Sequence, residues 1–255
     1  MQFIKETTIK FLLTNILHEW LQQHPGAFHP VVQFDPLREK IIHLDSSDKN
    51  DVFTSLDFSD TESLKKYTDD LLWQAGAKFG IGGYDEIRPM YSRSELFNSD
   101  MQNSFTSEEP RRLHIGVDIS GREGTEIFAP CDGKIHSFAF NNRFGDYGAT
   151  IILFHQFEDI SFHTLYGHLG LADIENIHEG QQVTGGQLFA HFGNQEENGH
   201  WPPHLHFQII HNIGDYKGDY PGVCKVSERE KYLLNCPDPD LILNMTRYLM
   251  QISSD

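Results

Sequence analysis

Two histidines lie two residues apart in the segment HWPPHLHFQII, residues 200–210. His204 and His206 follow the rigid pair Pro202-Pro203 and stand within a largely apolar run. Alternate side chains of an extended strand point to the same side, so both imidazoles would face one surface. That surface is either a solvated strand face that carries two histidines by chance, or the floor of a site.

Two further segments present polar groups in the same way. In HIGVD, His114 and Asp118 share a face if the segment is extended, and Gly116 between them leaves open space. In TLYGHL, alternation predicts a common face for Thr164, Tyr166 and His168.

Together these segments offer residue types that would suit a catalytic zinc ion. Two neutral imidazoles and one carboxylate are a standard set that leaves a fourth position open for water. Because the chain has 15 histidines, any one of these motifs can arise by chance, and each motif alone favours a packed or solvated histidine. Their coincidence within one β-rich region favours a metal site.

The region from about Leu113 to His211 resembles the lysostaphin-type zinc metallopeptidases, endopeptidases that cut peptidoglycan cross-bridges and stem peptides. HIGVD matches the family's His-x-Gly-x-Asp, YGHL its Tyr-x-His-Leu segment, and HLHF its His-x-His. The intervening segments GTEIFAPCDGKI, GDYGATIILFH and HEGQQVTGGQLFAHFGN follow the family's pattern in the same order.

This resemblance implies a role for each polar residue. His114, Asp118 and His206 would bind one zinc ion per chain, and His168 and His204 would be the catalytic imidazoles beside it. The chain has no HExxH segment, so the glutamate base of that class is missing. Proton transfer near pH 7 therefore falls jointly to His168 and His204.

The expected enzyme is a hydrolase, a zinc-dependent endopeptidase that cleaves a peptide bond with metal-activated water. Its substrate would be a peptide or a peptidoglycan fragment. Tyr166 and Trp201 are expected at the substrate cleft, with a cap on the core as the alternative for Trp201. The segments GGYDEIRPMYSRSELF, GDYPGV and NCPDPDLIL resemble a subset of the family regarded as intracellular.

Three other interpretations compete with the peptidase. One is a structural β domain whose histidines are incidental, and it must explain three coincident motifs. A non-catalytic or latent module with the same fold could bind or regulate a partner, although such modules usually lose metal ligands and all five polar positions are present here. A cupin-type metal enzyme also carries His-x-His on a strand. It needs a glutamate shortly after the pair, where this chain has FQIIHNIG.

The elements around the motifs predict a mainly β fold. From about residue 113, short β-type runs alternate with Gly, Asn and Asp turns, which is typical of an antiparallel sheet or barrel-like sandwich. Helical spacing runs from Ile9 to Leu21, and a capping box at Ser59 to Glu62 begins a second helix. A last helix follows Asp238, with its apolar stripe at Leu241, Met245, Tyr248, Leu249 and Ile252.

We therefore expect three parts in the chain. An α+β extension occupies residues 1–105, the peptidase domain residues 106–225, and a helical segment that packs on the body residues 226–255. The loop 84–110 runs directly into the first ligand motif, so it could cover the cleft and keep the enzyme latent.

The composition restricts the partners. The chain has 255 residues, with 20 Lys and Arg against 37 Asp and Glu, and a net charge of −17. Nucleic-acid surfaces need clustered basic residues, and anionic membranes repel an acidic protein. No segment approaches the ~20 apolar residues of a membrane span. We expect neither a nucleic-acid partner nor a membrane span, and the oligomeric state stays open.

The N-terminal segment and the cysteines favour the cytoplasm. The first 26 residues lack the uninterrupted apolar run of roughly 7–15 residues that a signal peptide needs. Cys131, Cys224 and Cys236 are odd in number and form no CxxC pair, which disfavours a disulfide framework. Export by a route that needs no N-terminal signal is the alternative.

Overall fold

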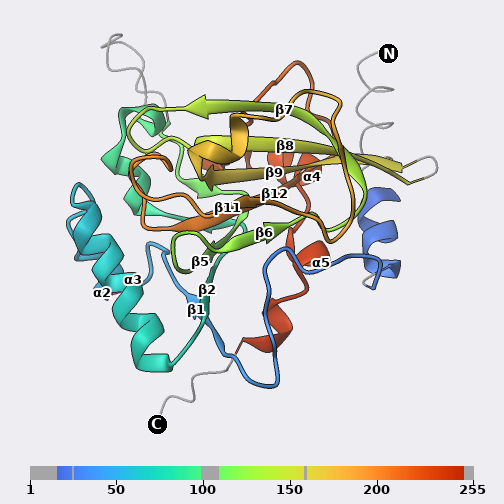
Figure 1. Ribbon diagram of the computed structural model, residues 1–255. Coiled ribbons are helices and arrows are strands. Elements are labelled where there is room, and N and C mark those ends of the chain that lie inside the picture. Colours follow the sequence, from blue (N-terminus) through green and yellow to red (C-terminus); the bar gives the residue numbers. More distant parts are fainter. Residues whose placement is uncertain (1–15, 25, 99–108, 158–159, 250–255) are drawn as a thin grey trace.

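The computed structural model describes residues 16–24, 26–98, 109–157 and 160–249. Its largest element is an eight-stranded mixed sheet in the order β1-β2-β5-β12-β9-β8-β7-β10. Figure 1 shows these strands stacked from β7 at the top to β1 at the bottom. The strands are β1 (Ile41–Leu44), β2 (Phe79–Gly82), β5 (Val117–Ser120), β7 (Gly133–Asn141), β8 (Gly148–Phe157), β9 (Ile160–Leu169), β10 (Gln182–Val183) and β12 (His204–Ile210).

Two small sheets complete the β structure. One pairs β6 (Glu126–Phe128) with β11 (Leu188–His191), and the other has the order β13-β4-β3. The latter consists of β3 (Glu86–Ile87), β4 (Leu113–His114) and β13 (Val223–Cys224). The predicted mainly β class is confirmed, and within the described residues the large sheet is open, with β1 and β10 at its two edges.

The strand β12 is buried along its whole length, because both of its faces are covered. On one face Leu205, Phe207 and Ile209 join the main apolar core. The opposite face carries His204 and His206. One strand therefore serves both as a core element and as the floor of the site.

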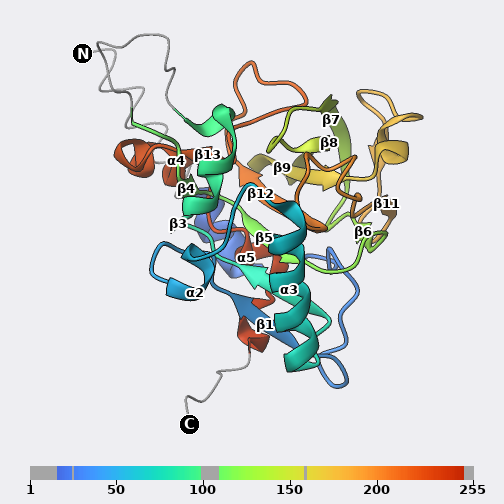
Figure 2. The same ribbon diagram turned by 90° about the vertical axis from the view of Figure 1, so that its left-hand side faces the viewer.

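The N-terminal strands extend the sheet that carries this floor. Strand β2 pairs antiparallel with β5, so that Gly82 lies opposite Asp118, and β1 pairs parallel with β2. The helix α3 (Thr61–Ala75) packs on β1 and β2 (Figure 2). Residues before 106 thus share hydrogen bonds and core with the residues after them.

The expected helices are present with shifted ends. Residues 16–23 are helical and bury Leu17 and Leu21, while the first part of that predicted helix lies outside the described residues. The second helix begins at α3, whose cap is Asp60 rather than Ser59, because the Asp60 carboxylate accepts a hydrogen bond from the Glu62 amide. A short helix α2 (Asp51–Thr54) precedes it.

The C-terminal helix is present but shorter than the apolar stripe suggests. Only α5 (Asp240–Leu243) falls within the predicted range, and a separate helix α4 (Arg229–Asn235) precedes it. Asn244 takes a left-handed conformation with φ 49°, which ends α5, and the Asp240 carboxylate binds the Met245 and Thr246 amides beyond it. Ile252 lies outside the described residues.

Cys131, Cys224 and Cys236 are buried and free. Among the described residues, no helix is long and apolar enough to span a bilayer.

The shared sheet predicts that the extension and the peptidase strands unfold together. Phe79 on β2 is 1% exposed and packs in the main core. Replacing it with alanine should lower the free energy of unfolding by about 3–5 kcal/mol, because a buried aromatic ring leaves a cavity. Urea denaturation should show a single transition at a lower midpoint. The control Trp73→Ala, which removes an 86% exposed ring from α3, should leave the midpoint nearly unchanged. A separate early transition in Phe79→Ala would contradict the view that the extension and the peptidase strands unfold together.

Candidate metal centre

Three strands bring the predicted ligands together. His114 ends β4, Asp118 lies on β5, and His206 lies on β12. The register of β12 with β5 places His206 directly opposite Asp118. His114 reaches the same point from the small sheet, where it pairs with Val223 of β13.

The donor atoms of these three residues converge. The Nε2 atom of His114 lies 2.9 Å from Nδ1 of His206 and 3.3 Å from Oδ1 of Asp118. The His206 Nδ1 atom lies 3.1 Å from the same carboxylate oxygen. Ligands at zinc distances of about 2.0–2.1 Å in a tetrahedron stand about 3.3 Å apart, so the spacing of this group fits a zinc ion.

Hydrogen bonds on the far side of each ring orient the histidines. The Nδ1 atom of His114 donates to the Gly83 carbonyl at 2.8 Å, which leaves the Nε2 lone pair for a metal. The Nε2 atom of His206 donates to the side-chain oxygen of Gln208 at 3.0 Å, which leaves Nδ1. The Gln208 amide nitrogen in turn donates to the Pro221 carbonyl and to the Cys236 sulfur, and this fixes the oxygen toward His206.

The charges at this point also fit a cation. All three residues are buried. Burial lowers the pKa of His114 to about 4, so its ring is neutral at pH 7. Burial alone would raise the pKa of Asp118, but His114 and Arg88 lower it well below its ordinary value. Electron-pair donors that face one point repel one another unless a cation or a proton lies between them.

His168 and His204 lie beside this group. Their ring centroids are 4.1 Å apart, and the His168 ring is 6.4 Å from that of His206. The Nδ1 atom of His168 donates to the Asn198 carbonyl at 2.8 Å, and that of His204 to the Pro202 carbonyl at 2.7 Å. Each ring therefore keeps Nε2 as its free acceptor, and burial lowers the pKa of both rings.

The position of His168 corrects the expectation for Tyr166. His168 has a positive φ of 66°, so the alternation of β9 breaks at this residue and its ring turns to the side of His204. Tyr166 stays on the opposite face, where it is fully buried against Phe189 and Phe207. The prediction that Tyr166 shares a face with His168 and lines the cleft is wrong.

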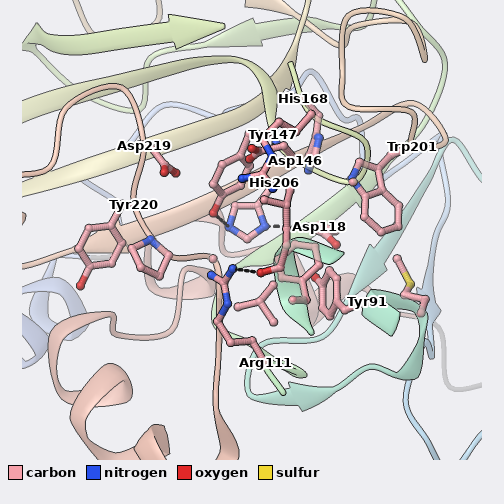
Figure 3. Close-up of a pocket in the computed structure, with 18 of the residues that line it drawn as sticks. Tyr91, Arg111, Asp118, Asp146, Tyr147, His168, Trp201, His206, Asp219 and Tyr220 are labelled. Carbon is pink, nitrogen blue, oxygen red and sulfur yellow. Dashed lines mark hydrogen bonds and ion pairs between the residues drawn. The ribbon is translucent and has the colours of Figure 1, made fainter. Parts of the chain in front are cut away.

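A cavity of about 280 Å³ is lined by Asp118, His168, His204 and His206, and Trp201 also lines it. Trp201 is also 2% exposed and meets Tyr91 edge-on with ring centroids 6.0 Å apart. Figure 3 shows His206 between Tyr147 and Asp118, with Trp201 and Tyr91 to one side and Tyr220 to the other.

The described part of the segment 84–110 forms one wall of this cavity, through Met90, Tyr91, Leu96 and Phe97. Arg111, Asp146 and Asp219 add charged groups to the lining. Burial raises the pKa of both Asp146 and Asp219. With Arg143 and Asp118, which also line it, the cavity combines aromatic rings with two guanidinium groups and three carboxylates.

Sequence reasoning missed several neighbours of the ligands. Gln208 follows His206 by two residues, so the alternation that found His206 could also have found it. Tyr147, whose hydroxyl lies 3.4 Å from the His206 Nε2 atom, and Arg88, which binds Asp118, come from elements that are remote in the chain.

Residues 112–217 match the model of Peptidase family M23. This match covers less than half of the chain, and this segment is similar to that family. The resemblance to the lysostaphin-type metallopeptidases is therefore confirmed for this part of the chain.

Curated relatives agree with this assignment. The chain is 28% identical over 156 residues to a Haemophilus influenzae protein named "Uncharacterized metalloprotease", which covers 59% of this chain and 30% of the relative. It is 33% identical over 97 residues to the "DD-carboxypeptidase/endopeptidase Mpg" of Neisseria meningitidis, which covers 38% of this chain and 20% of the relative. The chain thus spans less than a third of the length of either relative.

One solved structure similar to this chain is the catalytic domain of lysostaphin from Staphylococcus simulans. It is 25% identical, with a TM-score of 0.33, and the match covers 47% of this chain and 80% of that domain.

The convergence predicts that the chain binds one zinc ion through these three residues. Asp118→Asn or His206→Ala should weaken zinc binding by more than about 100-fold, beyond what the loss of an outer-shell partner costs. Calorimetric titration of the apo-protein measures both stoichiometry and affinity. His178→Ala, at an exposed histidine, is the matched control and should bind zinc as the parent does. Unchanged binding in both ligand variants would contradict the assignment.

Proposed function

We propose that this chain is a zinc-dependent endopeptidase that hydrolyses a peptide bond with metal-activated water. The observation that supports it most is the convergence of His114, Asp118 and His206 to within about 3 Å of one another, as the donor distances of 2.9, 3.1 and 3.3 Å record. Two further imidazoles, those of His168 and His204, line one cavity together with Asp118 and His206. The M23 match supports the same reaction class.

The proposed reaction needs a metal ion and groups that transfer protons, and different residues of the chain provide for each. When bound, zinc lowers the pKa of a water to about 7 and polarises the scissile carbonyl. His168 and His204 keep Nε2 as a free acceptor, because each Nδ1 proton is held by a backbone carbonyl. Either ring can take a proton from the attacking water and return it to the leaving amine. We assign this proton transfer, with support of the developing oxyanion, to the two rings jointly.

Peptides, including peptidoglycan-derived peptides, are the proposed substrates. The cavity offers aromatic walls at Tyr91, Trp201 and Tyr220, and the charged groups Arg111 and Asp219. Aromatic rings can pack on peptide backbone and side chains, while the charges can orient polar substituents. The name of the Neisseria meningitidis relative, a DD-carboxypeptidase/endopeptidase, supports testing peptidoglycan fragments first.

A non-catalytic module with the same fold is the competing proposal. It would not need the two imidazoles that lie beside the metal group. Here both rings are buried next to that group, with their tautomers fixed by backbone carbonyls. This arrangement favours the enzyme.

The sharpest test replaces His204 with alanine. We expect the variant to keep its zinc, because the three metal donors are untouched, and to lose about 10²–10⁴-fold in kcat, because a proton-transfer group is gone. Zinc-loaded protein is incubated with a mixture of peptidoglycan fragments and ordinary peptides, and cleaved bonds are identified by mass spectrometry.

Two controls make the result decisive. His178→Ala should retain full turnover, and the parent protein treated with a chelator should lose it. Full activity in His204→Ala would contradict the catalytic role assigned to that ring. If the zinc-loaded parent cleaves no bond in either substrate pool, the non-catalytic reading is favoured.

A further inference from the structure

A short segment of the N-terminal part lies directly behind two of the three metal donors. Residues 82–88, with the sequence GGYDEIR, follow β2 and lead through β3. The Gly83 carbonyl accepts the His114 Nδ1 hydrogen bond at 2.8 Å. Gly82 lies opposite Asp118 in the sheet, and an Arg88 guanidinium Nη1 atom binds the Asp118 carboxylate.

Arg88 is buried in an unusual way for a cation. It is 1% exposed, and its Nε atom donates to Glu86 at 2.6 Å while Nη2 donates to the Gly83 carbonyl at 3.3 Å. Removing an arginine and two carboxylates from water is costly, and apolar residues of similar volume would serve stability as well or better. The cost of this ionic cluster favours a role at the metal group over a role in stability.

The two oxygens of Asp118 have separate partners. Oδ1 faces Nε2 of His114 at 3.3 Å and Nδ1 of His206 at 3.1 Å. Oδ2 faces away from this point and is bound by Arg88. Only one oxygen of the carboxylate is therefore directed at the point where the donors converge.

The backbone leaves room for this contact at one glycine. A Cβ atom added at Gly82 would lie 2.8 Å from Arg88 Nη2 and 3.5 Å from the Asp118 Cβ atom. The absence of a side chain there lets the guanidinium reach the carboxylate.

We propose that Arg88 is a positioning residue of the metal centre, which holds Asp118 as a ligand through Oδ1 alone. This inference rests on the proposed zinc site. With Oδ2 held by Arg88, the carboxylate would offer a bound zinc ion only Oδ1, which would leave one coordination position for water. Arg88 binds Oδ2 through Nη1 alone, and Glu86 and the Gly83 carbonyl hold the guanidinium in place through its Nε and Nη2 atoms. The working metal centre therefore includes residues 82–88 and does not begin at the M23 match.

The test compares Arg88→Met with the parent in the full chain. We expect zinc affinity, measured by competition with a chromophoric chelator, to fall about 10–100-fold, the usual effect of losing an outer-shell partner. Cobalt(II) substitution gives a second readout. Its visible absorption is intense in a four-coordinate site and weak at higher coordination, so the variant should absorb less as Asp118 becomes free to bind through both oxygens.

Matched variants separate positioning from folding and from charge. Glu86→Gln combined with Arg88→Met removes the carboxylate that the single change leaves unpaired, and it should show the same loss of affinity. Arg229→Met breaks the exposed ion pair of Arg229 with Asp85 in the same segment and should bind both metals as the parent does. If Arg88→Met does not fold, Arg88→Lys replaces it. A single ammonium cannot hold Glu86, Asp118 and the Gly83 carbonyl together, so zinc affinity should fall several-fold.

Two failures can be told apart. If the parent binds zinc and the folded Arg88 variant binds it with equal affinity and an unchanged cobalt spectrum, the role of Arg88 is overturned and the zinc site stands. If the parent itself binds no zinc, the proposed function fails, and the inference fails with it.

Discussion

The structure depends on one electrostatic constraint, the meeting of three electron-pair donors in a buried place. His114, Asp118 and His206 approach one another to about 3 Å, and the separations of 2.9, 3.1 and 3.3 Å leave room for a small cation. Such a group can persist only if neighbouring groups fix each donor's direction. Gly83 and Gln208 do this for the two rings, and Arg88 does it for the carboxylate.

The sheet supplies this geometry by using both faces of its central strands. Side chains on one face of β12 anchor the strand in the core, so those on the other face are held by the same backbone. The register with β5 and β9 then places Asp118 and Gly167 on either side of His206. Gly167 has no side chain, and a Cβ atom there would meet Tyr147 at 2.4 Å. The ring of Tyr147 thus lies close to the His206 ring because a glycine occupies this position.

The sequence could predict what depends on local pattern. Alternation along strands identified the His204 and His206 face, and spacing identified His114 with Asp118. Alternation failed at His168, because the positive φ of this residue turns its side chain to the other face. Outside glycine, no residue type reliably indicates a positive φ. It also missed Arg88, because the pairing of β2 with β5 joins segments about 40 residues apart, and nothing in either segment alone specifies that contact.

These contacts make the residues before the M23 match part of the site. The wall at Tyr91 and Phe97 and the contact of Arg88 both come from this part of the chain. The most direct measurement is anomalous X-ray diffraction at the zinc edge from crystals of the zinc-loaded full chain. We predict one anomalous peak, which marks a zinc ion bonded to His114 Nε2, Asp118 Oδ1 and His206 Nδ1. Asp118 Oδ2 should keep its hydrogen bond to Arg88. A peak elsewhere, or zinc bound by both oxygens of Asp118 with Arg88 displaced, would contradict it.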